Sequence, residues 1–411
     1  MSNLTIESIL GPLSAADFLS DYWGKRVLRA SGDPARFADL LPWAALNRIL
    51  NEQTLKAPRA RLVKEDILIP DSEYHAAGIA SHLSNGALLS ISMMQDFHPA
   101  IRDLAAEFER FFHEVTNVNA YIGFRESKGF EYHWDDHEVF VLQVHGRKRW
   151  EVQDRSTAAP LYRELIMWDA APGNIIWEGV LEPGDVLYIP RGFWHKAECG
   201  DEPSVHLSFG VDVSTGIDLL QWLARELRAS ELYRTDLPRF ESPQARRERS
   251  RQLRSELVKL FSDDTVDRYF AAADRDATNK VQINLPESVT LDPDSTWVRW
   301  NTPRPTPLGL EQGLGRFVTA DCLGENRLLP KKAQKMLHLI ADGGALLSDL
   351  IAVSDPELNP GQVCSFVSKW ASEGMVAIET AGRPSSAKPA TKPAAKMPAK
   401  KAVNKKQAKR R

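Results

Sequence analysis

The stretch His133-Trp134-Asp135 decides the fold of this chain, together with a histidine about sixty residues later, His195. Side chains at positions i and i+2 of a β-strand point to the same face, so we expect His133 and Asp135 to project side by side. Residues 184–195 read as a turn, a short apolar strand and a Pro/Gly-punctuated bend that delivers His195. Two imidazoles and one carboxylate on a rigid sheet form the facial triad that favours non-haem Fe(II) and leaves coordination positions open.

The His-x-Asp motif alone is weak, because a chain with ten histidines contains roughly half an expected copy by chance. Its surroundings strengthen the interpretation. A Gly-Asp turn at Gly184 and a Pro-x-Gly-x-x-His segment ending at His195 lie at a separation from His133 that suits two strands of one barrel. Residues 146–150, Gly-Arg-Lys-Arg-Trp, follow on the strand pair that begins near His133.

At these residues the chain resembles the JmjC-type ribosomal oxygenases, which are 2-oxoglutarate-dependent protein hydroxylases of the cupin superfamily. The resemblance rests on residues 133–150 and 183–195, and more weakly on the domain order along most of the first 380 residues. It implies that Lys148 binds the distal carboxylate of the cosubstrate 2-oxoglutarate. It also implies three catalytic residues that bind Fe(II), namely His133, Asp135 and His195.

The strand pattern agrees with a jelly-roll barrel of the cupin type, also called the JmjC double-stranded β-helix. Short apolar segments separated by turns lead to the metal-binding histidine. We expect strands at residues 120–124, 139–144, 149–152, 174–177, 185–189 and 204–213. The fold class is therefore α+β.

The last of these strands alternates between apolar and polar residues, with Val205, Leu207 and Phe209 on one face. If this apolar face packs on outer helices, His206 and Ser208 look into the cavity, where they could contact the cosubstrate. The alternative is that both are polar groups satisfied by structural hydrogen bonds.

Lys148 has two interpretations. Lysine is mostly exposed, and residues 147–149 could form a solvated edge. Alternation along a strand, however, places Lys148 on the opposite side from Arg147 and Arg149, so at least one of the three faces inward unless all lie in a turn. An ammonium held in a barrel needs an anionic partner, and a dicarboxylate cosubstrate supplies one.

Wrapping elements and a helical module flank the barrel. A helix capped by Ser14 and mixed structure between about 36 and 115 complete a catalytic domain at residues 1–215. Leucine stripes then predict a helical module at residues 216–290. In the resembled family this module forms a homodimer, and from sequence alone it could equally be an intramolecular bundle.

Residues 291–380 predict a winged-helix-like domain, and a Pro/Thr-rich linker at 301–307 lies within its start. Helices are expected at 331–341, 346–353 and 360–373, followed by a strand at 375–379. The third helix offers only Lys369 as a base, against Glu373. A helix that reads DNA normally carries more positive charge, so nucleic-acid recognition by this domain is not favoured.

The net charge of −3 divides into +11 on residues 381–411 and −14 on the rest of the chain. This last segment is biased towards Ala, Pro and Lys and is expected to be a disordered basic tail. It could hold the protein near RNA or the ribosome through phosphate contacts, or it could simply be a solubilising extension.

Composition excludes several classes of protein. Cys199, Cys322 and Cys364 are too few and too scattered for a disulfide framework or a cysteine-based zinc site, so we expect reduced thiols. No run of eighteen apolar residues occurs, and the first five residues lack the basic and apolar pattern of a secretory signal. We expect a cytoplasmic protein without a membrane partner.

Two classes of function follow. The first is an Fe(II)- and 2-oxoglutarate-dependent dioxygenase that hydroxylates an arginine or histidine of a protein, by resemblance a ribosomal one. The second is a nucleic-acid-associated binding protein whose metal-binding cupin barrel is secondary. The metal triad together with Lys148 favours the first, because a binding module has no need of all four residues.

Overall fold

The structure is a computed structural model. It describes residues 4–380 with the exception of 54, 125–126, 128, 162–170, 278–289, 303, 305–307, 311–316, 323–324 and 342.

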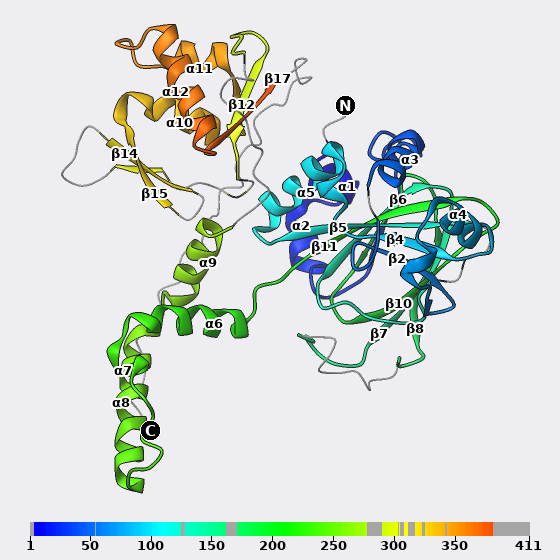
Figure 1. Ribbon diagram of the computed structural model, residues 1–411, viewed down its shortest axis with the longest axis horizontal. Helices are drawn as coiled ribbons and strands as arrows, with labels where there is room; N and C mark the ends of the chain where they lie inside the picture. Colours follow the sequence, from blue (N-terminus) through cyan, green and yellow to red (C-terminus); the bar gives the residue numbers. More distant parts are fainter. Residues whose placement is uncertain are drawn as a thin grey trace, which may run out of the picture.

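Two antiparallel sheets form the N-terminal domain and pack face to face (Figure 1). In spatial order, the large sheet contains β1 (Leu28–Ala30), β9 (Val186–Ile189), β6 (Glu138–His145), β11 (Ser204–Val211), β5 (Thr116–Gly123), β4 (Leu88–Ile91), β2 (Ala60–Lys64) and β3 (Ile67–Leu68). The small sheet contains β10 (Phe193–Cys199), β7 (Lys148–Arg155) and β8 (Ile175–Leu181).

Alternation along β6 and β11 separates two apolar cores. Val139 and Val141 point between the sheets, where they meet Trp150 and other residues of the small sheet. The outward residues of β11, such as Leu207 and Phe209, pack beneath the helices. Because both faces of β6 are covered, its sequence reads as a nearly continuous apolar run.

Helices cover the outer face of the large sheet. They are α1 (Ile6–Leu10), α2 (Ala15–Asp21), α3 (Trp43–Glu52), α4 (Ala76–Ser84) and α5 (Pro99–Phe112). The Ser14 hydroxyl caps α2 by accepting from the Asp17 amide, as its sequence predicts. On α5, Phe108 stacks on Phe209 of β11 at 4.7 Å between ring centroids, so this helix is locked to the strand that carries His206.

The helical module projects away from the barrel (Figure 1). It contains α6 (Gly216–Glu226), α7 (Glu231–Arg234), α8 (Pro243–Leu260) and α9 (Thr265–Arg275). Its small core joins Leu219, Trp222 and Leu223 to Tyr269. The sequence predicts a leucine stripe on α8, but no residue of this helix is buried within the chain.

The C-terminal module has the winged-helix-like content predicted from the sequence. It contains α10 (Gln334–Ala341), α11 (Leu347–Val353), α12 (Pro360–Ser372) and the antiparallel strands β16 (Ala345–Leu346), β12 (Thr296–Trp300) and β17 (Val376–Thr380). A further sheet was not predicted and consists of β13 (Leu308–Leu310), β14 (Phe317–Cys322) and β15 (Glu325–Pro330).

Two chemical expectations can be compared with the described residues. Cys199 and Cys364 are free thiols. No helix in the described part of the chain is long and apolar enough to span a membrane.

A buried ion pair joins the modules. Arg304, which precedes β13, contacts Glu109 of α5 at 3.0 Å and Asp274 of α9 at 3.3 Å. Arg304 and Glu109 are both buried. Burial raises the pKa of Glu109 to about 7, although the Arg304 guanidinium acts in the opposite direction. Three segments far apart in the sequence therefore meet at one charged contact.

This junction predicts a pH-dependent stability. A carboxyl whose folded pKa exceeds its unfolded value stabilises the fold at low pH, and this contribution is lost as the pH rises through about 7. Thermal unfolding should be measured between about pH 5 and pH 8. Over this range the free energy of unfolding of the wild type should fall by about 2–3 kcal/mol relative to that of Glu109→Gln. The control is Glu107→Gln, a more exposed carboxyl of the same helix. Parallel pH profiles for wild type and Glu109→Gln would contradict the assignment.

Candidate metal and dicarboxylate site

An isolated antiparallel bridge brings the two halves of the predicted metal site together. The His133 amide donates to the His195 carbonyl at 3.1 Å, and the His195 amide donates back at 2.7 Å. The sequence predicts a strand around His133 and a bend at His195. Instead, His195 is the third residue of strand β10, whereas residues 134–135 lie in a loop outside any strand.

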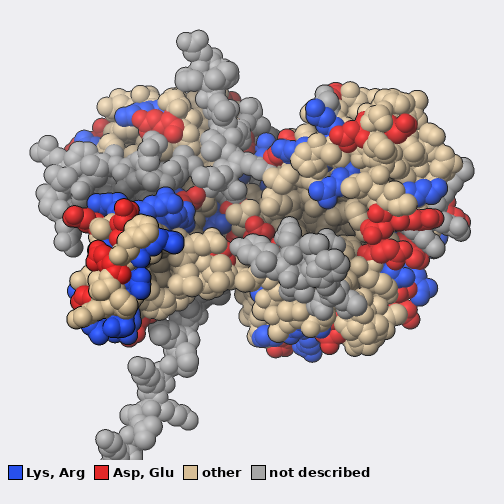
Figure 2. All heavy atoms as spheres, turned by 60° about the horizontal axis from the view of Figure 1, so that its bottom comes forward, with Lys and Arg blue, Asp and Glu red and all other residues tan. Residues whose placement is uncertain are grey.

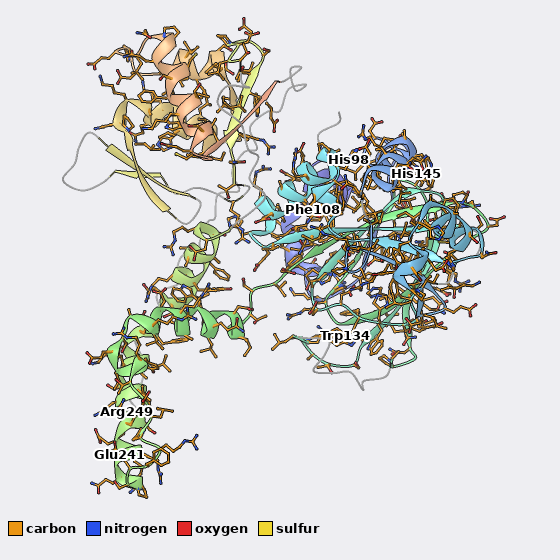
Figure 3. The ribbon with its side chains drawn as sticks, in the orientation of Figure 1. His98, Phe108, Trp134, His145, Glu241 and Arg249 are labelled. Carbon is orange, nitrogen blue, oxygen red and sulfur yellow. The ribbon has the colours of Figure 1, made fainter. Side chains whose placement is uncertain are left out.

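The three predicted ligands lie around one point. One nitrogen of His133, one of His195 and a carboxylate oxygen of Asp135 all lie within 4.8 Å of one another. The His195 Nε2 atom is 3.5 Å from an Asp135 oxygen. Trp134 is buried and does not line the pocket that these residues share, and Figure 3 shows it at the lower rim of the barrel.

Backbone carbonyls orient both imidazoles. His133 Nδ1 lies 2.9 Å from the Glu131 carbonyl, and His195 Nδ1 lies 3.0 Å from the Phe193 carbonyl. A carbonyl only accepts, so each Nδ1 carries the hydrogen and each Nε2 keeps its lone pair for a ligand. Two neutral imidazoles and one carboxylate of this kind fit a divalent transition metal with open positions.

Lys148 lies at the other end of the same pocket. It is buried, and its Nζ donates to His206 Nδ1 at 2.9 Å. Burial lowers the pKa of Lys148, while the Cys199 thiol opposes this shift. Burial, followed by the nearby Lys148 charge, holds the pKa of His206 well below its usual value. The neutral His206 ring therefore accepts at Nδ1 and carries its hydrogen on Nε2.

The residues beside Lys148 face outward. Arg147 pairs with Glu202, and Arg149 pairs with Glu178, both on the surface. No carboxylate among the described residues lies within ion-pair distance of Lys148. An ammonium that is buried without an anionic partner predicts that an anion comes from a ligand.

One pocket connects the metal ligands with Lys148. Its empty volume is about 460 Å³, including space that is open to solvent. The pocket is lined by Leu88, Tyr121, Phe130, His133, Asp135, Val139, Lys148, Trp150, His195, Ala197, His206 and Ser208. All six candidate site residues from the sequence are in this set.

The sequence interpretation missed the aromatic lining. Tyr121 stacks on the His206 ring at 4.8 Å between ring centroids, and Phe130 meets Tyr121 edge to face. The alternation of side chains along β7 could have identified Trp150, because Trp150 lies two residues after Lys148 on the same face of this strand. Nothing local marks Phe130, which comes from a loop.

The comparisons with known proteins agree with this geometry. A family model described as a JmjC domain matches residues 90–219. These residues form a JmjC domain. Among curated proteins, the bifunctional lysine-specific demethylase and histidyl-hydroxylase NO66 of Drosophila persimilis is 30% identical over 215 residues, covering 50% of this chain and 31% of that protein. Ribosomal oxygenase 1 of Rattus norvegicus is 32% identical over 216 residues, covering 50% of this chain and 36% of that protein.

The chain is also similar to solved structures in fold. The Escherichia coli ribosomal oxygenase YcfD matches with a TM-score of 0.58 at 19% identity, covering 89% of this chain and 98% of that chain. A YcfD structure in complex with cobalt and 2-oxoglutarate matches with a TM-score of 0.55 at 19% identity, covering 90% of this chain and 99% of that one. The predicted α+β cupin fold and the predicted resemblance are thus confirmed. The chain spans about a quarter to a half of the length of the curated relatives it matches.

The grouping of His133, Asp135 and His195 predicts metal binding that depends on Asp135. Purified metal-free protein should bind about one Fe(II) per chain under anaerobic titration, and Asp135→Ala should lose this binding because the only carboxylate of the trio is removed. Asp136→Ala is a matched control, because the neighbouring Asp136 pairs with His137 at 3.2 Å instead. Equal iron stoichiometry in Asp135→Ala and wild type would show that these three residues do not form the iron site.

Proposed function

We propose that the protein is an Fe(II)- and 2-oxoglutarate-dependent dioxygenase that hydroxylates a protein side chain. One observation carries the proposal. A single pocket holds a transition-metal donor set at one end and, at the other, a buried ammonium with no carboxylate partner among the described residues. A dicarboxylate that chelates a metal with its 2-oxo acid end fits both ends at once.

Each residue has a defined task in this proposal. His133, Asp135 and His195 would hold Fe(II), and the bound ion would supply the oxidative chemistry with dioxygen. Lys148 pairs with the distal carboxylate of 2-oxoglutarate. His206 and Ser208 face the same pocket and complete the polar contacts of the cosubstrate.

The overall reaction is balanced by the two substrates. One oxygen atom of dioxygen enters succinate as 2-oxoglutarate loses carbon dioxide, and the other becomes the hydroxyl group of the product. The apolar and aromatic walls, including Phe130 and Val139, exclude water from this chemistry. The protein thus contributes ligand geometry and orientation, while the redox chemistry belongs to the metal.

The proposed substrate is an arginine or histidine side chain of a ribosomal protein. Two similar proteins are named ribosomal oxygenases, and the curated relatives named NO66 are named histidyl-hydroxylases. Succinate release and a mass gain of one oxygen on candidate ribosomal proteins test this directly. Succinate release without modification of a ribosomal protein would show that the proposed substrate class is wrong. Asp135→Ala serves as the inactive control.

The alternative function, nucleic-acid binding with a secondary barrel, has less support from the folded modules. On the face shown in Figure 2, Lys and Arg side chains are interspersed with Asp and Glu rather than gathered into a basic stripe. On α12, Lys369 lies 3.9 Å from Glu373. The basic tail, residues 381–411, lies outside the described residues. We propose that it contacts RNA or the ribosome and that the protein acts in the cytoplasm.

We also propose the domain limits 1–215, 216–290, 291–380 and 381–411, with the second domain as a homodimerisation module. The support is exposed apolar surface on this module. Leu237 is 69% exposed, Phe240 98% and Val258 65%. A partner subunit would bury these side chains, which a lone chain leaves in water.

Lys148 separates a 2-oxoglutarate enzyme from other metal-binding cupins. Lys148→Ala should raise the half-saturating 2-oxoglutarate concentration by a factor of about ten to a hundred, since a lost charge-assisted contact costs roughly 1.5–3 kcal/mol. Lys148→Arg should retain part of the affinity, because a guanidinium still meets a carboxylate. Arg149→Ala is the matched control, since Arg149 faces solvent. An unchanged 2-oxoglutarate dependence in Lys148→Ala would show that Lys148 does not bind the distal carboxylate.

The tail can be tested separately. Deleting residues 381–411 should leave turnover of a small peptide largely intact and weaken retention on RNA or ribosomes, because the tail carries a charge of +11. The difference between full-length and truncated protein should disappear at high salt. Equal retention of both at low salt would contradict the proposed contact.

A further inference from the structure

Trp150 is one of the residues that line the pocket. It is 4% exposed and follows Lys148 by two residues on the inward face of β7. Its ring lies 6.1 Å from the ring of His195 and 5.1 Å from that of His206, between centroids. Trp150 is therefore close both to a candidate metal ligand and to the Lys148–His206 pair.

The indole N–H of Trp150 is buried and has no hydrogen-bond partner among the described residues. Most buried N–H groups are paired, because a buried donor without an acceptor loses its hydrogen bonds to water and gains nothing. Trp194, a neighbour in the small sheet, follows this rule and donates to the Ser156 hydroxyl at 3.0 Å. Trp150 departs from it inside a ligand pocket.

The neighbouring Lys148–His206 pair does not accept the Trp150 hydrogen. Lys148 is a donor, and the only ring nitrogen of His206 that accepts already receives the Lys148 hydrogen. Lys148 and Trp150 both line the pocket from the same face of β7. Both would be satisfied by the same anion.

We propose that the Trp150 indole N–H donates a hydrogen bond to the distal carboxylate of 2-oxoglutarate, to the oxygen that Lys148 does not bind. This inference rests on the proposed function. Two donors on one carboxylate make Trp150 a specificity-determining residue. A 2-oxo acid that lacks the second carboxylate leaves both donors buried and unpaired, so the pocket discriminates against it.

Calorimetric titration of the full chain loaded with Zn(II) tests this without turnover. The ligands are 2-oxoglutarate and 2-oxopentanoate, which has the same chain length without the distal carboxylate. Trp150→Phe should weaken 2-oxoglutarate binding about ten- to a hundredfold and change 2-oxopentanoate binding much less. Trp300→Phe is the matched control, because its indole N–H is also buried and unpaired, but in the C-terminal module.

Packing and hydrogen bonding can be separated. Replacing Trp150 with 3-benzothienylalanine keeps the bicyclic ring and removes only the N–H, and it should reproduce the loss seen in Trp150→Phe. The indole ¹⁵N–¹H signal that Trp150→Phe removes should shift when 2-oxoglutarate is added to the Zn(II)-loaded wild type, and stay in place with 2-oxopentanoate.

The outcomes that overturn the proposal are distinct from failure of the proposed function. If the wild type binds 2-oxoglutarate and the benzothienylalanine protein binds it equally well, Trp150 does not contact the distal carboxylate. Equal losses for 2-oxoglutarate and 2-oxopentanoate would also overturn the contact. If the wild type binds no 2-oxoglutarate, the proposed function itself fails.

Discussion

The backbone bridge between His133 and His195 is the constraint on which the site depends. It fixes a loop to β10, and β10 is in turn held in antiparallel register with β7 from Phe193 to Cys199. Carbonyls two residues before each histidine accept from the Nδ1 groups, so each Nε2 atom keeps its lone pair. Asp135 adds a carboxylate oxygen to the same group. The geometry of this candidate metal site is thus a property of the backbone more than of side-chain packing.

The second constraint is electrostatic. A buried ammonium at Lys148 is costly unless it is paired, and among the described residues a neutral imidazole and a thiol surround it. The pocket therefore contains the Lys148 and Trp150 donors, which no carboxylate among the described residues satisfies. A buried ammonium without an anionic partner lowers the stability of the fold, but it favours binding of a small dianion. Such a conflict between stability and function is expected at a binding site.

The helix α5 connects the pocket with the rest of the chain. Phe108 on α5 packs on Phe209 of β11, the strand that presents His206 and Ser208 to the pocket. The next residue, Glu109, forms the buried contact with Arg304 that joins the modules. One helix therefore supports both the wall of the pocket and the position of the C-terminal module.

Local patterns in the sequence determined most of the barrel. Alternation along a strand is a local property, so it separated Lys148 from Arg147 and Arg149, and it identified the polar face with His206 and Ser208. Local patterns also predicted the cap at Ser14, the helices of the C-terminal module and the candidate metal ligands that the structure brings together. Three features became visible only in the folded chain: Lys148 contacts His206, the Trp150 N–H lacks an acceptor among the described residues, and Arg304 reaches Glu109. These facts depend on burial and on contacts between residues 58 to 195 positions apart, which no local periodicity encodes.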